Sequence, residues 1–393
     1  MPTQRDFAGE TLRRMTESGC GKNSIMLIMK PTSACNMRCA YCYHSGTGYS
    51  GGVFDTAMLE KLIRLTETGY DEVRYIWHGG EPLLTGHEYF REIVRLEERY
   101  RRPGQRISNG VQTNGTLLDD EYLDFFEKNG FSVSVSFDGP GICNDLRGET
   151  DAVDAVLRKI ASRPKLGPAS ISVVHAGNAG RQIEMYEYFK GLGLPMKFNP
   201  MFPDGSAMEI PDKALTAEEY TAELGRLFDH WLKDPCAVPV EPIEQFLNIL
   251  FGRRGKDCVY GSCLYRWLGV DSKGDIYPCG RSYTDEYMLG NIAEVGSLQE
   301  VFDGPAYGRL ARGAILRREN CLAACEYYGM CQGGCNSRSI MAGDIEAPDP
   351  FNCYVLKEMI NYMSRRIREC ETSCPRDMNP IVRRLLAEGE MLI

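Results

Sequence analysis

The chain of 393 residues lacks the segments that direct a protein out of the cell or into a membrane. Its opening segment, MPTQRDFAGETLRRMTESG, carries charges throughout and has no apolar core of a signal peptide. No run approaches the ~18 consecutive apolar residues that a membrane-spanning helix requires. We therefore expect a cytoplasmic protein with no membrane partner.

Basic charge is also scarce. The chain has 45 Lys and Arg against 54 Asp and Glu, which gives a formal net charge of -9. Nucleic-acid binding needs a clustered basic surface, so we expect no nucleic-acid partner. The length exceeds the roughly 250–300 residues at which a single hydrophobic core stops growing, so more than one domain is expected.

Cysteine, in contrast, is plentiful, with 16 residues. Because thiols stay reduced in the cytoplasm, metal binding explains them better than disulfides do. Three of them, Cys35, Cys39 and Cys42, lie within the polar segment PTSACNMRCAYCYHSG. Three thiolates from one loop leave a fourth coordination position open, as in catalytic metal sites. Thiolates select zinc or iron–sulfur clusters, and the spacing alone does not choose between these two.

Strand-like and helix-like segments alternate through the first half of the chain. The predicted strands are Ser24–Lys30, Glu72–Trp77, Arg106–Gln112, Phe131–Phe137, Ser170–His175 and Pro195–Asn199. The predicted helices are Thr56–Thr68, Glu88–Arg101, Asp120–Asn129, Ala152–Ser162 and Gln182–Leu192. This alternation predicts an α/β domain with parallel strands. Periodicity cannot decide between a doubly wound sheet and an incomplete barrel.

The pattern changes after Pro200. A linker precedes predicted helices at about Ala217–Lys233 and Pro242–Gly252, and a last helix is predicted at about Phe351–Cys370. The segment from Cys258 to Cys353 is rich in Gly and Cys, which is typical of a domain held together by metal. We therefore predict an N-terminal extension (1–23), an α/β domain (24–202), a helical bridge (203–257), a cysteine-rich domain (258–374) and a tail (375–393).

Four motifs each follow a predicted strand, where parallel α/β folds carry their sites. They are CxxxCxxC with Tyr43 after its last cysteine, then HGGEPLL, QTNGT and SFDGP. With these motifs the chain resembles the radical S-adenosylmethionine superfamily. The resemblance implies a partial (β/α)6 TIM-like barrel. It also implies a [4Fe–4S] cluster on Cys35, Cys39 and Cys42 that binds S-adenosylmethionine (SAM), and a 5′-deoxyadenosyl radical that abstracts a substrate hydrogen.

The same resemblance implies contacts to SAM. Tyr43 would lie near it, Gly79 and Gly80 would let the backbone approach its methionyl part, and Glu81 would accept from its ammonium group. Further along the chain, Asn114 and Ser136 would lie near the cofactor and Arg147 would pair with its carboxylate. His78 and His44 are the expected substrate-facing residues.

The cysteines of the second half, in CLYRWLGVDSKGDIYPC and CLAACEYYGMCQGGC, resemble the SPASM extension, which binds two auxiliary [4Fe–4S] clusters. The resemblance assigns Cys258, Cys263, Cys279 and Cys335 to the first cluster, and Cys321, Cys325, Cys331 and Cys353 to the second. Three residues separate Cys321 from Cys325, where the family usually has two. From spacing alone, zinc-ribbon sites remain an alternative. Cys20, Cys143, Cys236, Cys370 and Cys374 receive no role.

Within the SPASM group, HGGEP, QTNGTLLD, YPC and MLGNI resemble anaerobic sulfatase-maturating enzymes and the maturases of ribosomally synthesised peptides (RiPPs). Sulfatase-maturating enzymes oxidise a Cys or Ser to formylglycine, with a catalytic aspartate directly after the YPC cysteine. Here that position is Gly280, which offers no base. Asp285 or Glu286 might replace it.

We therefore predict a RiPP maturase that installs a thioether or C–C crosslink in a precursor peptide or protein. Formylglycine formation and a non-catalytic iron–sulfur electron carrier are the alternatives. An electron donor such as flavodoxin or ferredoxin is the expected second partner.

Overall fold

The computed structural model describes residues 23–44, 52–253, 258–260, 263–281, 285–373 and 376–393, so Cys20 and Cys374 lie outside the described residues. Its centre is a ten-stranded sheet in the order β10-β9-β8-β1-β2-β3-β4-β5-β6-β7. The strands are β1 (Ser24–Met29), β2 (Glu72–Trp77), β3 (Arg106–Thr113), β4 (Ser132–Ser136), β5 (Ala169–Val174), β6 (Met196–Pro200), β7 (Val240–Glu241), β8 (Trp267–Val270), β9 (Asp275–Tyr277) and β10 (Gly290–Asn291).

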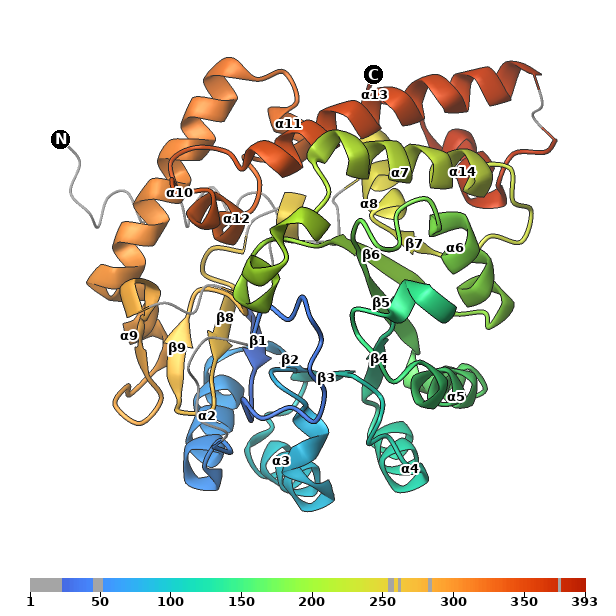
Figure 1. The fold of residues 1–393 in the computed structure, drawn as a ribbon. Helices are drawn as coiled ribbons and strands as arrows, with labels where there is room; N and C mark the ends of the chain where they lie inside the picture. Colours follow the sequence, from blue (N-terminus) through green and yellow to red (C-terminus); the bar gives the residue numbers. More distant parts are fainter. Residues whose placement is uncertain (1–22, 45–51, 254–257, 261–262, 282–284, 374–375) are drawn as a thin grey trace.

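Strands β1 to β7 are parallel neighbours, joined by helices on the outside of the curved sheet (Figure 1). These helices are α2 (Thr56–Gly69), α3 (His87–Tyr100), α4 (Asp120–Lys128), α5 (Thr150–Ala161) and α6 (Gln182–Gly191). Alternate strand residues such as Leu27, Val73 and Trp77 are buried in the main hydrophobic core, which also includes residues of these helices. The prediction of a partial barrel, and not a doubly wound sheet, is confirmed.

The cysteine-rich segment is joined to the barrel through the sheet itself. Strand β8 pairs in parallel with β1, from Met26 opposite Trp267 to Met29 opposite Val270, and β9 and β10 extend the sheet by antiparallel pairing. In this way β8 covers the edge of β1 that β2 leaves unpaired. At the other end, β7 from the predicted helical bridge pairs with β6. The sequence predicted a separate metal-held unit, whereas the structure builds one continuous sheet.

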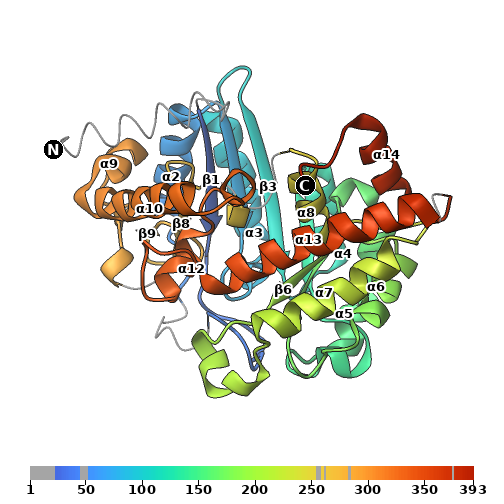
Figure 2. The ribbon, with the colours of Figure 1, turned by 90° about the horizontal axis from the view of Figure 1, so that it is seen from above.

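The remaining helices lie over the barrel and beside it. They are α7 (Ala217–Trp231), α8 (Ile243–Leu250), α9 (Leu298–Asp303), α10 (Pro305–Ala324), α11 (Tyr328–Cys331), α12 (Asn336–Met341), α13 (Pro350–Ser373) and α14 (Pro380–Glu388). Helix α13 runs along α7 and α8 (Figure 2). The predicted tail contains α14, whose N-cap Asn379 donates to the Trp231 carbonyl and accepts from the Ile381 N–H.

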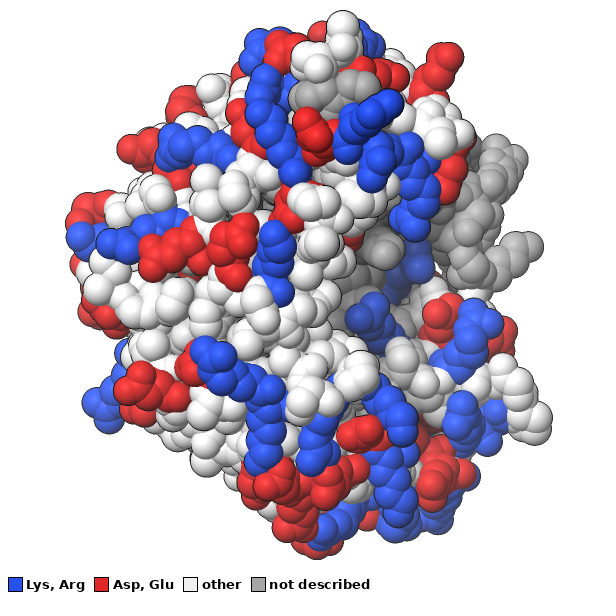
Figure 3. Space-filling model, turned by 90° about the vertical axis from the view of Figure 1, so that its right-hand side faces the viewer, with Lys and Arg blue, Asp and Glu red and all other residues white. Residues whose placement is uncertain are grey.

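The surface is mixed in charge where it can be seen. On the side where α5, α6 and α14 lie, basic and acidic side chains are interspersed (Figure 3). Within the described ranges, no helix has both the length and the apolarity that crossing a bilayer demands.

Candidate active site

The loop that carries Cys35, Cys39 and Cys42 follows β1 and is fixed by the HGGEP loop that follows β2. The Gly80 N–H donates to the Thr32 carbonyl at 3.0 Å, and the Glu81 N–H donates to the Ala34 carbonyl at 2.8 Å. These two loops therefore meet at the carboxyl end of the sheet, where a parallel α/β fold places its site.

The two glycines are required by close approach between these loops. A Cβ at Gly80 would lie 2.0 Å from the Ala34 carbonyl oxygen. Gly79 has φ +118°, and a Cβ there would lie 2.8 Å from the Thr32 oxygen. We expected the glycines to admit the cofactor. The structure shows a different reason for them, because they admit the backbone of the cysteine loop.

Glu81 joins the HGGEP loop to the end of β3. Its carboxylate is fully buried and accepts hydrogen bonds from the Leu83 N–H (3.1 Å), the Thr113 hydroxyl (2.7 Å) and the Asn114 N–H (2.8 Å). Burial raises its pKa. In this structure Glu81 fixes the loop, and its contact to the SAM ammonium group stays a prediction.

The other predicted cofactor residues line the same end of the barrel. The Asn114 Nδ2 donates to Asn36 Oδ1 at 2.9 Å and lies 3.9 Å from the Cys35 sulfur. Ser136, the last residue of β4, accepts from the Gln112 amide at 2.7 Å.

Arg147 is buried beside the cysteine loop. Its Nε donates to the Tyr41 hydroxyl at 3.0 Å and lies 3.7 Å from Asp138. Asp138 also accepts from the Tyr41 hydroxyl. The guanidinium thus already has a carboxylate partner, and its pairing with the SAM carboxylate stays a prediction.

Tyr43, His44 and His78 lie together around Lys30, which sequence reasoning missed. Ring centroids of Tyr43 lie 6.3 Å from His44 and 6.1 Å from His78, and Lys30 Nζ lies 3.4 Å from His44 Nδ1. Burial lowers the pKa of His44 to about 4, that of His78 to about 3 and that of Lys30 to about 7. Both histidines are therefore neutral at pH 7. A lysine directly after a buried strand was the signal that could have found Lys30.

Three segments far apart in the chain meet at Asp204 and Arg281. Arg281 lies 4.8 Å from the centre of the Tyr43 ring and forms an ion pair with Asp204 at 3.0 Å. Asp204 belongs to the loop after β6, which is joined to the cysteine loop by a hydrogen bond from the Ser206 N–H to the Cys42 carbonyl. Asp285 and Glu286, the expected substitutes for a base, lie exposed on a short turn.

Gly280 faces the first strand. A Cβ at Gly280 would lie 2.8 Å from Cγ2 and 3.0 Å from Cδ1 of Ile28. A side chain at this position therefore requires Ile28 to move or to be smaller.

We expect Gly280→Asp to lower the stability by about 1–3 kcal/mol, because it overfills this contact. The added replacement of Ile28 by Ala is expected to recover part of that loss by opening space for the new side chain. Thermal unfolding of the single and double variants checks this. A fully stable single variant would contradict it.

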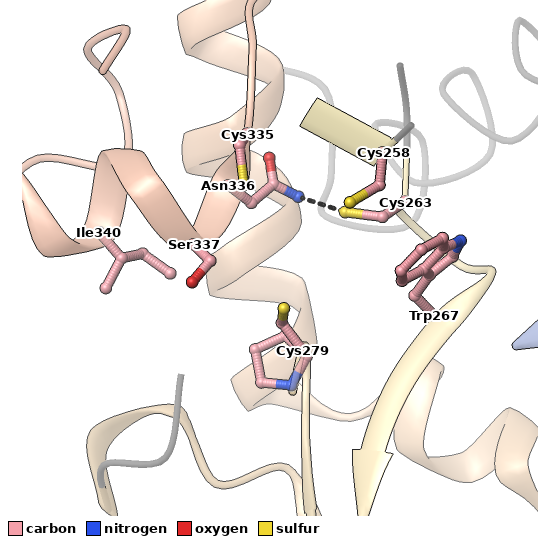
Figure 4. Close-up of a pocket in the computed structure, with 9 residues that line it drawn as sticks. Cys258, Cys263, Trp267, Cys279, Cys335, Asn336, Ser337 and Ile340 are labelled. Atoms are coloured by element: carbon pink, nitrogen blue, oxygen red, sulfur yellow. Dashed lines mark hydrogen bonds between the residues drawn. The ribbon is translucent and has the colours of Figure 1, made fainter. Parts of the chain in front are cut away.

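The four cysteines predicted for the first auxiliary cluster surround one cavity (Figure 4). Its lining includes Cys258, Cys263, Cys279, Cys335, Trp267 and Asn336. Burial raises the pKa of Cys263 to about 12 and that of Cys335 to about 11. Such thiols ionise at neutral pH only when a metal replaces the proton. The cavity thus fits a cluster, although its ligation stays a prediction.

The four cysteines of the second predicted site are also neighbours. Burial raises the pKa of Cys331, and the nearby Cys321, Cys353 and Cys325 raise it further. The unusual gap of three residues places Cys321 and Cys325 one helical turn apart at the end of α10, where the Cys325 N–H donates to the Cys321 carbonyl at 2.9 Å. The spacing therefore keeps both sulfurs at the same site.

Within the part of the chain that the structure describes, no three His, Cys, Asp or Glu side chains gather closely enough to hold a single metal ion. A four-iron cluster is wider than one ion and takes its thiolates further apart. The arrangement therefore fits clusters better than the zinc-ribbon alternative.

Comparison with known proteins agrees with this geometry. Residues 29–167 match the radical SAM superfamily, and residues 258–336 match the SPASM family, an iron–sulfur cluster-binding domain. The chain is 27% identical over 365 residues to a cysteine-type anaerobic sulfatase-maturating enzyme of Clostridium perfringens, covering 87% of this chain and 97% of that protein. It is 29% identical over 333 residues to a serine-type enzyme of Klebsiella aerogenes, covering 81% of both.

A solved structure, native anSMEcpe with bound AdoMet, has a TM-score of 0.77 and 26% identity, and covers 88% of this chain and 99% of that one. These findings overturn the predicted crosslinking of a ribosomal peptide, because the curated relatives are sulfatase-maturating enzymes along nearly their whole length. That prediction was wrong, and RiPP biosynthesis falls with it. The chain belongs to the radical SAM enzymes that carry a SPASM domain, and it uses SAM, a [4Fe–4S] cluster and auxiliary iron–sulfur clusters.

Proposed function

We propose that the chain oxidises a Cys or Ser side chain of a protein or peptide substrate to the aldehyde formylglycine. The observation that carries this proposal is its similarity to the C. perfringens sulfatase-maturating enzyme, which spans 87% of this chain and 97% of the relative. A related solved structure, native anSMEcpe with bound AdoMet and the Cp18Cys peptide, has a TM-score of 0.76, 26% identity, and coverage of 89% of this chain and 99% of that one.

In this proposal Cys35, Cys39 and Cys42 bind the cluster that holds SAM, and the two sets of four cysteines in the second half bind the auxiliary clusters. When bound, these groups supply a 5′-deoxyadenosyl radical that takes a hydrogen atom and an acceptor for one electron. The chain itself orients the reactants through the buried Glu81 and Asn114 and keeps water away from the radical.

Oxidation of a CH2–SH or CH2–OH group also releases a proton, which needs an acceptor. Gly280 supplies none, and Asp285 and Glu286 are exposed. We place this role at Asp204, because its carboxylate lies between the cysteine loop and Arg281 and because burial raises its pKa.

Two features of the cell follow from the proposal. Cleavage of SAM consumes an electron, which a small donor such as flavodoxin or ferredoxin would deliver. No cysteine of the described residues is in a disulfide, which agrees with a reducing compartment such as the cytoplasm.

The test is incubation of the reconstituted, reduced enzyme with SAM and matched peptides that carry Cys or Ser at one central position. We expect an aldehyde at that position, detected by hydrazide labelling and mass spectrometry, and no aldehyde from Cys35→Ala. Formation of 5′-deoxyadenosine with both peptides unmodified would contradict the proposed reaction while leaving the enzyme class intact.

A further inference from the structure

Arg317 is a fully buried cation on α10 whose hydrogen bonds all go to neutral groups. Its Nε donates to the Gly333 carbonyl at 2.8 Å, Nη1 donates to the Ile345 carbonyl at 2.6 Å, and Nη2 donates to Asn336 Oδ1 at 2.5 Å. A buried charge is costly unless an opposite charge lies near it.

The opposite charges near Arg317 are cysteine thiolates. Burial and the neighbouring Arg318 lower the pKa of Arg317, whereas Cys335, Cys263 and Cys321 raise it. Cys335 and Cys263 line the first auxiliary site, and Cys321 belongs to the second. The guanidinium therefore lies between the two sites, within electrostatic reach of both.

Arg317 also fixes the orientation of Asn336. A guanidinium has donors only, so the side-chain oxygen of Asn336 must face it. The amide nitrogen is then turned toward the first auxiliary site, where it donates to the Cys263 sulfur at 3.4 Å (Figure 4). Asn336 directly follows Cys335, so it lies against two sulfurs of the same cavity.

From this arrangement we infer that Arg317 and Asn336 raise the reduction potential of the first auxiliary cluster, and that Arg317 raises that of the second as well. The inference rests on the ligation proposed above for both clusters. Reduction adds one electron, and a nearby positive charge and an N–H···S hydrogen bond both stabilise the more negative, reduced cluster. Because the site is buried, water screens this charge little.

The experiment is a redox titration of the full-length, reconstituted enzyme followed by electron paramagnetic resonance. The component that changes on adding SAM is the radical cluster. The component that Cys263→Ala removes is the first auxiliary cluster, and the one that Cys353→Ala removes is the second.

Three variants separate charge from hydrogen bonding. Asn336→Asp keeps the shape and can still accept from Arg317, but it offers no N–H to Cys263 and adds a negative charge. Arg317→Met removes the buried cation. Arg312→Met, on the exposed side of the same helix, is the matched control.

We expect Asn336→Asp to shift the first auxiliary cluster to a more negative potential and to shift the second much less. We expect Arg317→Met to shift both and Arg312→Met to shift neither. Arg317→Lys keeps the charge and should restore much of the potential of the second cluster.

Full cluster loading with unshifted potentials in Asn336→Asp and Arg317→Met would overturn the inference alone. If Arg317→Met fails to load clusters, Asn336→Asp decides by itself for the first cluster. Cys263→Ala with unchanged iron content and signals would instead reject the proposed ligation, and the inference with it.

Discussion

Gly80→Ala is expected to reduce reductive cleavage of SAM by at least ~100-fold, because it separates the HGGEP loop from the cysteine loop. The new Cβ would lie 2.0 Å from the Ala34 carbonyl oxygen and 2.7 Å from that of Ser33. Neither is the end of a flexible side chain, so the backbone itself must move. The hydrogen bonds from Gly80 to Thr32 and from Glu81 to Ala34 are then lost or stretched.

The same change is expected to cost about 1–3 kcal/mol of stability, as overfilled sites do. The measurements are 5′-deoxyadenosine formation under strong reduction, iron content and thermal unfolding. Gly69→Ala is the control for the substitution itself, since a Cβ at Gly69 meets nothing within 4 Å. Gly86→Ala is the control for backbone strain, since Gly86 has φ +84° and equally open surroundings. Wild-type cleavage by Gly80→Ala would show that contact between the two loops does not position the cofactor.

A loss of stability between about pH 5 and pH 8 is the second large effect that we expect, and its source is Glu97 on α3. Glu97 is 9% exposed, and both its carboxylate oxygens lie 3.0 Å from Asn109 Nδ2. Burial raises its pKa from 4.5 to about 8. The folded protein thus favours the neutral acid, so the stability is complete below pH 4.5 and is lost as the pH rises toward 8.

The shift corresponds to about 5 kcal/mol at full ionisation. Glu97→Gln stays neutral, so its apparent Tm should fall much less than that of the wild type between pH 5 and pH 8. Glu67, whose pKa burial raises to about 7, leaves part of the slope in place. The exposed Glu98 on the same helix provides the control Glu98→Gln, which should follow the wild type. Parallel pH profiles of wild type and Glu97→Gln would contradict a buried neutral acid.

The local elements were readable from the sequence because their signals are local. Strand β2 has the predicted bounds Glu72–Trp77, and α2 begins at the predicted Thr56 with Asp55 as its N-cap. The CxxxCxxC spacing identified the enzyme class for the same reason, since three ligands in one loop need no knowledge of the rest of the fold.

The wrong prediction arose from one position. Gly280 was given more weight than the similarity of the whole chain, because it lacks the carboxylate expected there. A single side chain says little about which others the fold brings near it. The structure places Asp204, 76 positions earlier in the chain, beside the residue that follows Gly280.

By itself the sequence determined the radical SAM and SPASM class, the partial barrel and the cysteines that the structure brings together, since each depends on spacing or periodicity over a few residues. Only the tertiary structure decided that β8 joins β1 in one sheet, that Gly79 and Gly80 admit a neighbouring backbone, and that Arg317 lies between two sets of cysteines. These contacts join residues far apart in the chain. They follow from burial and close approach, which leave no periodic pattern in the order of amino acids.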